Sequence, residues 1–64
     1  MSMAWVAVDK NGTECLFSQK PSRGLEYCMW RITVHGVFVE LPQGTIKKLI
    51  GKELTWNDEP VELK

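Results

Sequence analysis

Hydrophobic and polar residues alternate most regularly in the middle of the chain, over residues 26–41 (EYCMWRITVHGVFVEL). Successive side chains of a β-strand point to opposite faces, so the first half of this stretch places four apolar residues on one face. His35-Gly36 then suits a two-residue turn, because glycine adopts positive φ without strain and histidine tolerates it better than most residues. The pattern predicts a β-hairpin around which the rest of the chain folds. The four inward residues are Cys28, Trp30, Ile32 and Val34.

This turn decides which residues of the hairpin face one another. Burying Trp30 and Ile32 contributes roughly 1.5–3 kcal/mol each, whereas an ion pair between Arg31 and Glu40 on the outer face contributes about 1 kcal/mol at most. Apolar burial therefore sets the register, and the ion pair agrees with it. The predicted facing pairs are Val34–Val37, Ile32–Val39, Trp30–Leu41 and, on the outer face, Thr33–Phe38 and Arg31–Glu40.

A second hairpin is predicted near the start of the chain, with strands at 4–8 and 13–17. Its turn, residues 9–12 (DKNG), favours a type I turn followed by a bulge, which places Asp9 opposite Thr13. A two-residue loop would instead set Asp9 against Glu14, two like charges. Both faces of this hairpin are apolar, so either the strand curls across the core or a later segment covers one face. One face carries Trp5, Ala7, Cys15 and Phe17, and the other carries Val6, Val8 and Leu16.

The remaining segments complete a small β-rich domain. Residues 18–24 are expected to form a connector because of Pro21, and a helix fits 44–50, capped by Thr45 and ended by Gly51. Two short strands, 54–56 and 61–63, are expected to flank a turn. The predicted fold is mainly β (α+β): a small antiparallel β-meander of four to six strands, curled or half-barrel, with one short helix near residues 44–50. Residues 1–64 are predicted to form a single domain, with 1–3 disordered. The helix face expected to point inward is Ile46, Leu49 and Ile50.

Three stretches of the chain carry a resemblance that spans nearly its whole length. Residues 5–23 read WVAVDKNGTECLFSQKPSR, residues 41–44 read LPQG, and residues 54–60 read LTWNDEP. The first resembles small uncharacterised bacteriophage and prophage proteins that share a W-x-A-x-D-x-x-G-x-x-x-L-F-x-x-K-P-x-R opening, and the other two are similar to endings in the same group. The shared positions are mostly turn and core residues, and the group has no assigned activity. The resemblance implies a setting, the cytoplasm of a bacterial host, and no mechanism.

Charge and length narrow the classes of function. Eight basic and eight acidic side chains cancel, which argues against a protein that coats polyanions. No apolar run approaches the ~20 residues of a membrane helix, and residues 1–12 lack the basic and apolar blocks of a signal peptide. A cytoplasmic location is therefore expected, with Cys15 and Cys28 as reduced thiols that pack as small hydrophobic side chains. A chain this short buries only about 60% of its unfolded surface, so dimerisation stays open.

Side chains that catalysis requires are scarce. A nucleophile needs a base within hydrogen-bond reach, and the single histidine, His35, sits at a predicted turn where backbone geometry explains it. A metal site built from Cys15, Cys28 and His35 lacks a fourth ligand and a C-x-x-C pair. No glycine-rich loop precedes a helix in the way that phosphate binding requires. The sequence predicts no enzyme activity, no metal site and no cofactor.

The outer face of the predicted 26–41 hairpin is the leading candidate surface, because exposed aromatic residues beside arginine are typical of protein interfaces. The alternative is that Trp5 or the C-terminal segment covers this face. The leading hypothesis is a small non-enzymatic protein-binding module, a phage accessory or inhibitor protein acting on a host or defence protein. The alternatives are single-stranded nucleic-acid binding, by base stacking beside basic side chains, and a self-associating structural subunit or homodimer. The candidate binding residues are Lys20, Arg23, Tyr27, Arg31 and Phe38.

Overall fold

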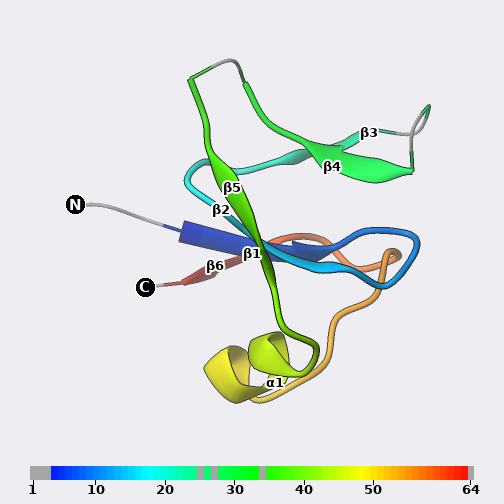
Figure 1. Ribbon diagram of the computed structural model, residues 1–64, viewed down its shortest axis with the longest axis vertical. Coiled ribbons are helices and arrows are strands. Elements are labelled where there is room, and N and C mark those ends of the chain that lie inside the picture. Colours follow the sequence, from blue (N-terminus) through cyan, green and yellow to red (C-terminus); the bar gives the residue numbers. More distant parts are fainter. Residues whose placement is uncertain (1–3, 25, 27, 34, 64) are drawn as a thin grey trace.

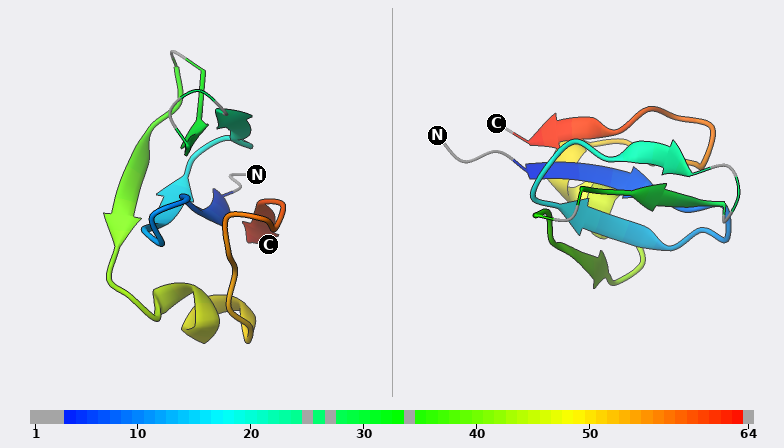
Figure 2. Two further views of the ribbon diagram at one scale, coloured as in Figure 1. Left: turned by 90° about the vertical axis from the view of Figure 1, so that its right-hand side faces the viewer. Right: turned by 90° about the horizontal axis from the view of Figure 1, so that it is seen from above.

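The computed structural model describes residues 4–24, 26, 28–33 and 35–63 and contains there six strands and one short helix. The elements are β1 (Ala4–Val8), β2 (Glu14–Phe17), β3 (Ser22–Gly24), β4 (Met29–Arg31), β5 (Phe38–Leu41), α1 (Thr45–Ile50) and β6 (Val61–Leu63). Four strands form an antiparallel sheet in the order β5-β2-β1-β6, called here the main sheet. Strands β3 and β4 form a small sheet over one face of the main sheet, and α1 lies over the other face (Figures 1 and 2). The predicted class, a mainly β chain of α+β type with one short helix, is confirmed.

The hairpin of β1 and β2 forms in the predicted register. Val8 faces Glu14, and the backbone N–H of Asp9 donates to the Thr13 carbonyl over 2.9 Å. Gly12 has a φ of 91° and donates its N–H back to the Asp9 carbonyl. This left-handed conformation is one that glycine adopts without strain. The bulged turn is therefore the correct alternative, and the like charges of Asp9 and Glu14 do not face each other.

Both faces of the main sheet are buried, each under a different part of the chain. On the side of the small sheet, Trp30 from β4 packs with Phe17 and Cys15. On the helix side, Ile46 packs against Val6 and Val8. Later segments thus cover both apolar faces of the β1–β2 hairpin. The buried residues are Ala7, Cys15, Phe17 and Trp30 on the first side, and Val6, Val8 and Ile46 on the second.

The predicted 26–41 hairpin is wrong. Strand β5 pairs with β2, where Val39 faces Leu16, and β4 pairs with β3, where Trp30 faces Arg23. The chain does turn near the predicted place, because the Gly36 N–H donates to the Thr33 carbonyl over 3.0 Å. The two arms then diverge into different sheets. The predicted cross-strand pairs Ile32–Val39, Trp30–Leu41, Thr33–Phe38 and Arg31–Glu40 are absent, and the pair involving Val34 lies outside the described residues.

Strand β4 pairs away from β5 because the buried Trp30 requires hydrogen-bond acceptors that lie at the end of β1. A buried indole N–H normally finds an acceptor, and Trp30 Nε1 donates to the Val8 carbonyl at the end of β1 over 2.8 Å. Its backbone N–H also donates to Asp9 Oδ1 over 3.0 Å. These two bonds hold β4 across one face of the main sheet. Leu41 meanwhile packs on the opposite, helix-side face.

Four smaller predictions also need correction. Residues 22–24 form strand β3 instead of a connector, and residues 54–56 are not a strand. Thr45 does not cap α1 with its side chain, because its hydroxyl donates to the Pro42 carbonyl over 2.6 Å. The end of α1 is as predicted, with Gly51 in a left-handed conformation at a φ of 82°. On the predicted inward face of α1, Ile46 is buried and Ile50 is half-buried, but Leu49 is exposed.

Candidate functional site

Strand β5 forms one edge of the main sheet, and exposed apolar side chains lie on it and on Val37, the residue directly before it. The exposed fractions are 67% for Val37, 51% for Phe38 and 55% for Val39. An edge strand is a template for pairing with another strand, and proteins usually protect such edges with charges, proline or a covering segment. Glu40 is the charged residue of β5. We call the outer side of residues 37–40 the β5 edge.

The backbone of the β5 edge is also oriented for pairing. The Ser18 N–H donates to the Val37 carbonyl over 2.9 Å, which makes Ser18 and Val37 a hydrogen-bonded pair of the antiparallel ladder. Such pairs alternate along the ladder, so Val39 directs its N–H and C=O toward β2. The N–H and C=O groups of Phe38 and Glu40 are therefore turned away from β2, toward the open side. The edge presents two donors and two acceptors at the spacing of a strand.

Packing holds the β5 edge in place although its outer side chains are exposed. Phe38 stacks on Phe17 with 5.8 Å between ring centroids and 30° between ring planes. Leu41 packs into the helix-side core. The Val37 N–H donates to the Ser18 hydroxyl over 2.9 Å, which fixes the start of the strand. A partner would therefore meet an ordered strand and would not have to order it.

A second candidate site is a hollow of about 480 Å³ beside the small sheet, called here the β3–β4 hollow. Both arginines of the chain line it, together with Lys20. Ser22 and Thr33 add hydroxyl groups, and Glu26 is the one acidic residue among the lining residues that the structure describes.

Arg23 reaches this hollow, but its guanidinium group is already bound. The group lies between two tryptophan rings, 4.4 Å from the Trp30 centroid and 4.7 Å from the Trp56 centroid. It donates to the Trp56 carbonyl and forms a 3.5 Å ion pair with Glu59. Cation–π contacts of this kind contribute about 0.5–2 kcal/mol. Arg23 thus fastens the segment after α1 to the small sheet.

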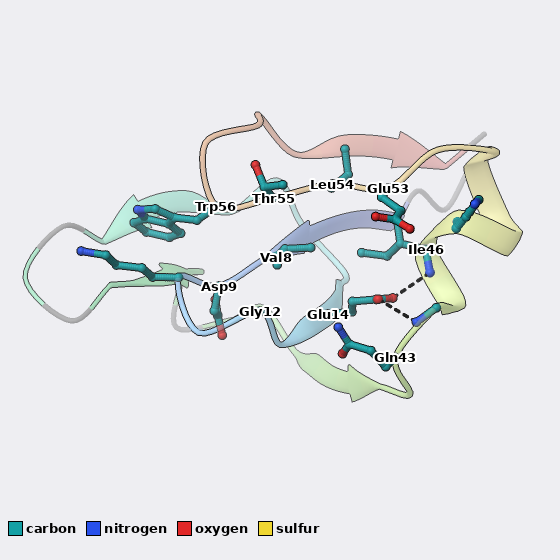
Figure 3. Close-up of a pocket in the computed structure, with 13 residues that line it drawn as sticks. Val8, Asp9, Gly12, Glu14, Gln43, Ile46, Glu53, Leu54, Thr55 and Trp56 are labelled. Carbon is teal, nitrogen blue, oxygen red and sulfur yellow. Dashed lines mark hydrogen bonds between the residues drawn. The ribbon is translucent and has the colours of Figure 1, made fainter.

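A second hollow, of about 260 Å³, lies between the β1–β2 turn, the start of α1 and residues 53–56 (Figure 3). Its two buried carboxylates are used in the fold. Glu14 accepts the Gly44 and Ile46 N–H groups over 2.8 Å each, as the dashed lines in Figure 3 show. Asp9 accepts the Trp30 N–H and, over 3.8 Å, the Cys15 thiol. These contacts explain both carboxylates structurally, so we assign this hollow no ligand.

The five sequence-predicted binding residues are divided by the structure. Lys20, Arg23 and Arg31 gather at the β3–β4 hollow. Phe38 lies on the β5 edge of the other sheet, and Tyr27 lies outside the described residues. Sequence reasoning placed Val37 and Val39 on an inner face and so missed the exposed edge. No local signal marks this edge, because the exposure of both valines depends on β4 leaving β5.

The buried Cys15 thiol has a clearly shifted pKa. Burial, followed by the negative charges of Asp9 and Glu40, raises the pKa of the Cys15 thiol to about 11. A thiol with a raised pKa is a poor nucleophile at neutral pH. His35 is exposed in the turn before β5. Among the described residues, no three His, Cys, Asp or Glu side chains gather as a metal site would require.

Comparisons with known proteins add no further assignment. No protein-family model, curated protein or solved structure matches this chain. In the part of the chain that the structure describes, no helix has the length and apolar character needed to cross a membrane.

Proposed function

We propose that this chain is a small protein-binding module that takes up an extended segment of a partner protein at the β5 edge. The observation that carries the proposal is an ordered edge strand with exposed apolar side chains at three consecutive positions, namely Val37 directly before β5 and Phe38 and Val39 within it. In strand addition, main-chain hydrogen bonds supply affinity, and the side chains on alternating positions supply specificity. The β5 edge offers both. In the bacteriophage setting that the resemblance implies, the partner is a host or defence protein in the bacterial cytoplasm.

The two faces of β5 define the partner segment that fits. Phe38 and Glu40 project on the side of the small sheet, and Val39 projects on the helix side, because side chains alternate along a strand. A partner strand with an apolar residue opposite Phe38 and a basic residue opposite Glu40 would match the first side. Opposed apolar and opposite-charge pairs contribute about 0.2–1 kcal/mol each.

Single-stranded nucleic-acid binding has less support. Arg23, one of its proposed contacts, is held between two tryptophan rings and is paired with Glu59. A formal net charge of +0 provides no general attraction for a polyanion.

The test compares two lysine substitutions at equally exposed apolar positions. Val39→Lys places a charge on the β5 edge, and Leu49→Lys places the same charge on α1, where the exposed fraction is 51%. Each immobilised variant is incubated with bacterial lysate, and a photo-crosslinking phenylalanine analogue at position 38 captures whatever contacts the edge. We expect wild type and Leu49→Lys to retain and crosslink the same protein, and Val39→Lys to lose it.

Three results would contradict the proposal. The Val39→Lys variant could still retain the partner protein, or the Leu49→Lys variant could lose it to the same extent. Either result would show that the β5 edge is not the binding site. The crosslinked partner could also be a second copy of this chain. Sedimentation would then show a homodimer, and the self-associating subunit would replace the binding module.

A further inference from the structure

The β3–β4 hollow contains an unusual set of side chains for a chain with no net charge. It gathers three of the eight basic residues of the sequence and one of the eight acidic residues, Glu26. The neighbouring hydroxyl groups of Ser22 and Thr33 are exposed. The Thr33 hydroxyl already donates to the side-chain carbonyl of Gln19. The hollow is therefore rich in positive charge, which is the chemistry that receives an anion, and the Ser22 hydroxyl adds a neutral donor.

A close backbone contact positions Arg31 in this hollow. Arg31 faces Ser22 in the small sheet, and the pair of Gly24 and Met29 lies two positions along, so that Arg31 and Met29 project from the same face of β4. Its Cγ and Cδ atoms lie over Gly24, each 2.7 Å from the point where a Cβ on that glycine would sit. Only a glycine leaves room for the arginine stem to cross the neighbouring strand at this distance. The stem of Arg31 is therefore partly ordered before any ligand arrives.

Two of the three cations remain for a ligand. Arg23 is bound inward by Trp30, Trp56 and Glu59, as described above. Arg31 and Lys20 are both exposed. The Lys20 side chain packs over the Trp5 ring, with 5.5 Å between the Lys20 Nζ atom and the ring centroid. The Arg31 guanidinium and the Lys20 ammonium could together bind one anionic group. The planar guanidinium of Arg31 can donate two parallel hydrogen bonds to a carboxylate.

We propose that the β3–β4 hollow binds a carboxylate side chain of an acidic peptide segment, with Arg31 and Lys20 as the contacts. A peptide suits the hollow better than a nucleic acid for two reasons. Strand binding neutralises several phosphates at once, whereas this hollow offers two exposed cations, Arg31 and Lys20. Base stacking needs an aromatic platform, and no aromatic residue occurs among the described residues that line the hollow. The site is separate from the β5 edge and does not depend on it.

The experiment titrates the isotope-labelled full chain with an end-blocked tetraglutamate peptide at low salt, followed by backbone amide NMR. A tetraglutamine peptide is the uncharged control, and an eight-nucleotide oligo-dT is the nucleic-acid arm. We expect saturable shifts for tetraglutamate in the amides of residues 20, 22–24 and 29–33, and these shifts should weaken as salt is added. Arg31→Gln should weaken binding about threefold to tenfold, because it removes a charge-assisted contact at an exposed site. Lys48→Gln, which changes the net charge equally on the exposed side of α1, should leave it unchanged.

Several outcomes would overturn the assignment. These are the absence of saturable shifts at low salt, equal shifts with tetraglutamine, and equal weakening by Arg31→Gln and Lys48→Gln. Tighter binding of oligo-dT on the same amides would assign the hollow to nucleic acid instead. Lys20→Gln is the second variant if Arg31→Gln disturbs the small sheet. The Val39→Lys variant should bind tetraglutamate like wild type, so failure of one proposal is distinguishable from failure of the other.

Discussion

Glu14 is predicted to hold the start of α1 against the main sheet, although it lies about thirty residues earlier in the chain. Its side chain extends from β2, is only 8% exposed, and accepts the Gly44 and Ile46 N–H groups over 2.8 Å each (Figure 3). The first N–H groups of a helix have no partner within the helix. A negative charge is also favourable at this end of the helix dipole. A helix of six residues does not persist alone in water, so this contact and the packing of Ile46 must keep it folded.

The cost of removing the contact follows from its geometry. Hydrogen bonds to a charged group contribute about 1.5–3 kcal/mol each. Glu14→Gln keeps one acceptor but turns an amide donor toward a backbone donor, so we expect a loss of about 2 kcal/mol in the free energy of unfolding. Glu14→Ala loses both bonds, and we expect about 3–4 kcal/mol. A domain of this length has a total stability of roughly 3–10 kcal/mol, so the loss in the alanine variant is a large fraction of the total.

Urea denaturation measures these losses, with tryptophan fluorescence and far-UV circular dichroism as two probes of unfolding. Glu53→Gln is the matched control, because Glu53 is an exposed carboxylate that lines the same hollow. Its substitution should change the free energy of unfolding by less than about 0.5 kcal/mol. The reasoning is refuted if Glu14→Gln is as stable as wild type, or if Glu53→Gln loses as much stability as Glu14→Gln.

Three further predictions concern the small sheet and the core. Arg23→Lys should lower the free energy of unfolding by about 1–2 kcal/mol, because lysine loses the planar stacking and the bond to the Trp56 carbonyl. The exposed Arg31→Lys is its control in urea denaturation, and equal losses would contradict the prediction. Gly24→Ala should lower the thermal midpoint, because the added Cβ would lie 2.7 Å from the Met29 carbonyl oxygen; an unchanged midpoint, measured beside Ser22→Ala, would argue against this contact. The pKa of Cys15 is about 11 in the folded state and 9.0 ordinarily, so the unfolded chain releases this proton first and stability should fall by about 2 kcal/mol between pH 9 and 11. Cys15→Ala should remove that part of the pH dependence, and identical pH profiles for variant and wild type would disprove the role of Cys15.

Local signals in the sequence determined several elements correctly. The turn at residues 9–12 is fixed by hydrogen bonds between residues three and four positions apart, and Gly51 ends α1 where a left-handed residue is required. The alternation along β1 and β2 assigned each side chain to its observed face. These features depend on neighbours along the chain, so the sequence alone can specify them. The sequence identified Lys20, Arg23 and Arg31 as candidate binding residues. It did not predict that the three side chains line the same hollow.

The partners of β4 and β5 were decided by the tertiary structure. Both strands alternate suitably, and a hairpin between them satisfies the same local pattern as the two sheets that form. The observed arrangement is selected by contacts across more than twenty residues, above all the bonds from Trp30 to Asp9 and Val8. The exposure of the β5 edge follows from that selection, because β4 covers one face of the main sheet and leaves β5 at its border. Sequence alternation specifies which side chains share a face of a strand, whereas only the summed long-range contacts specify which strand lies beside it.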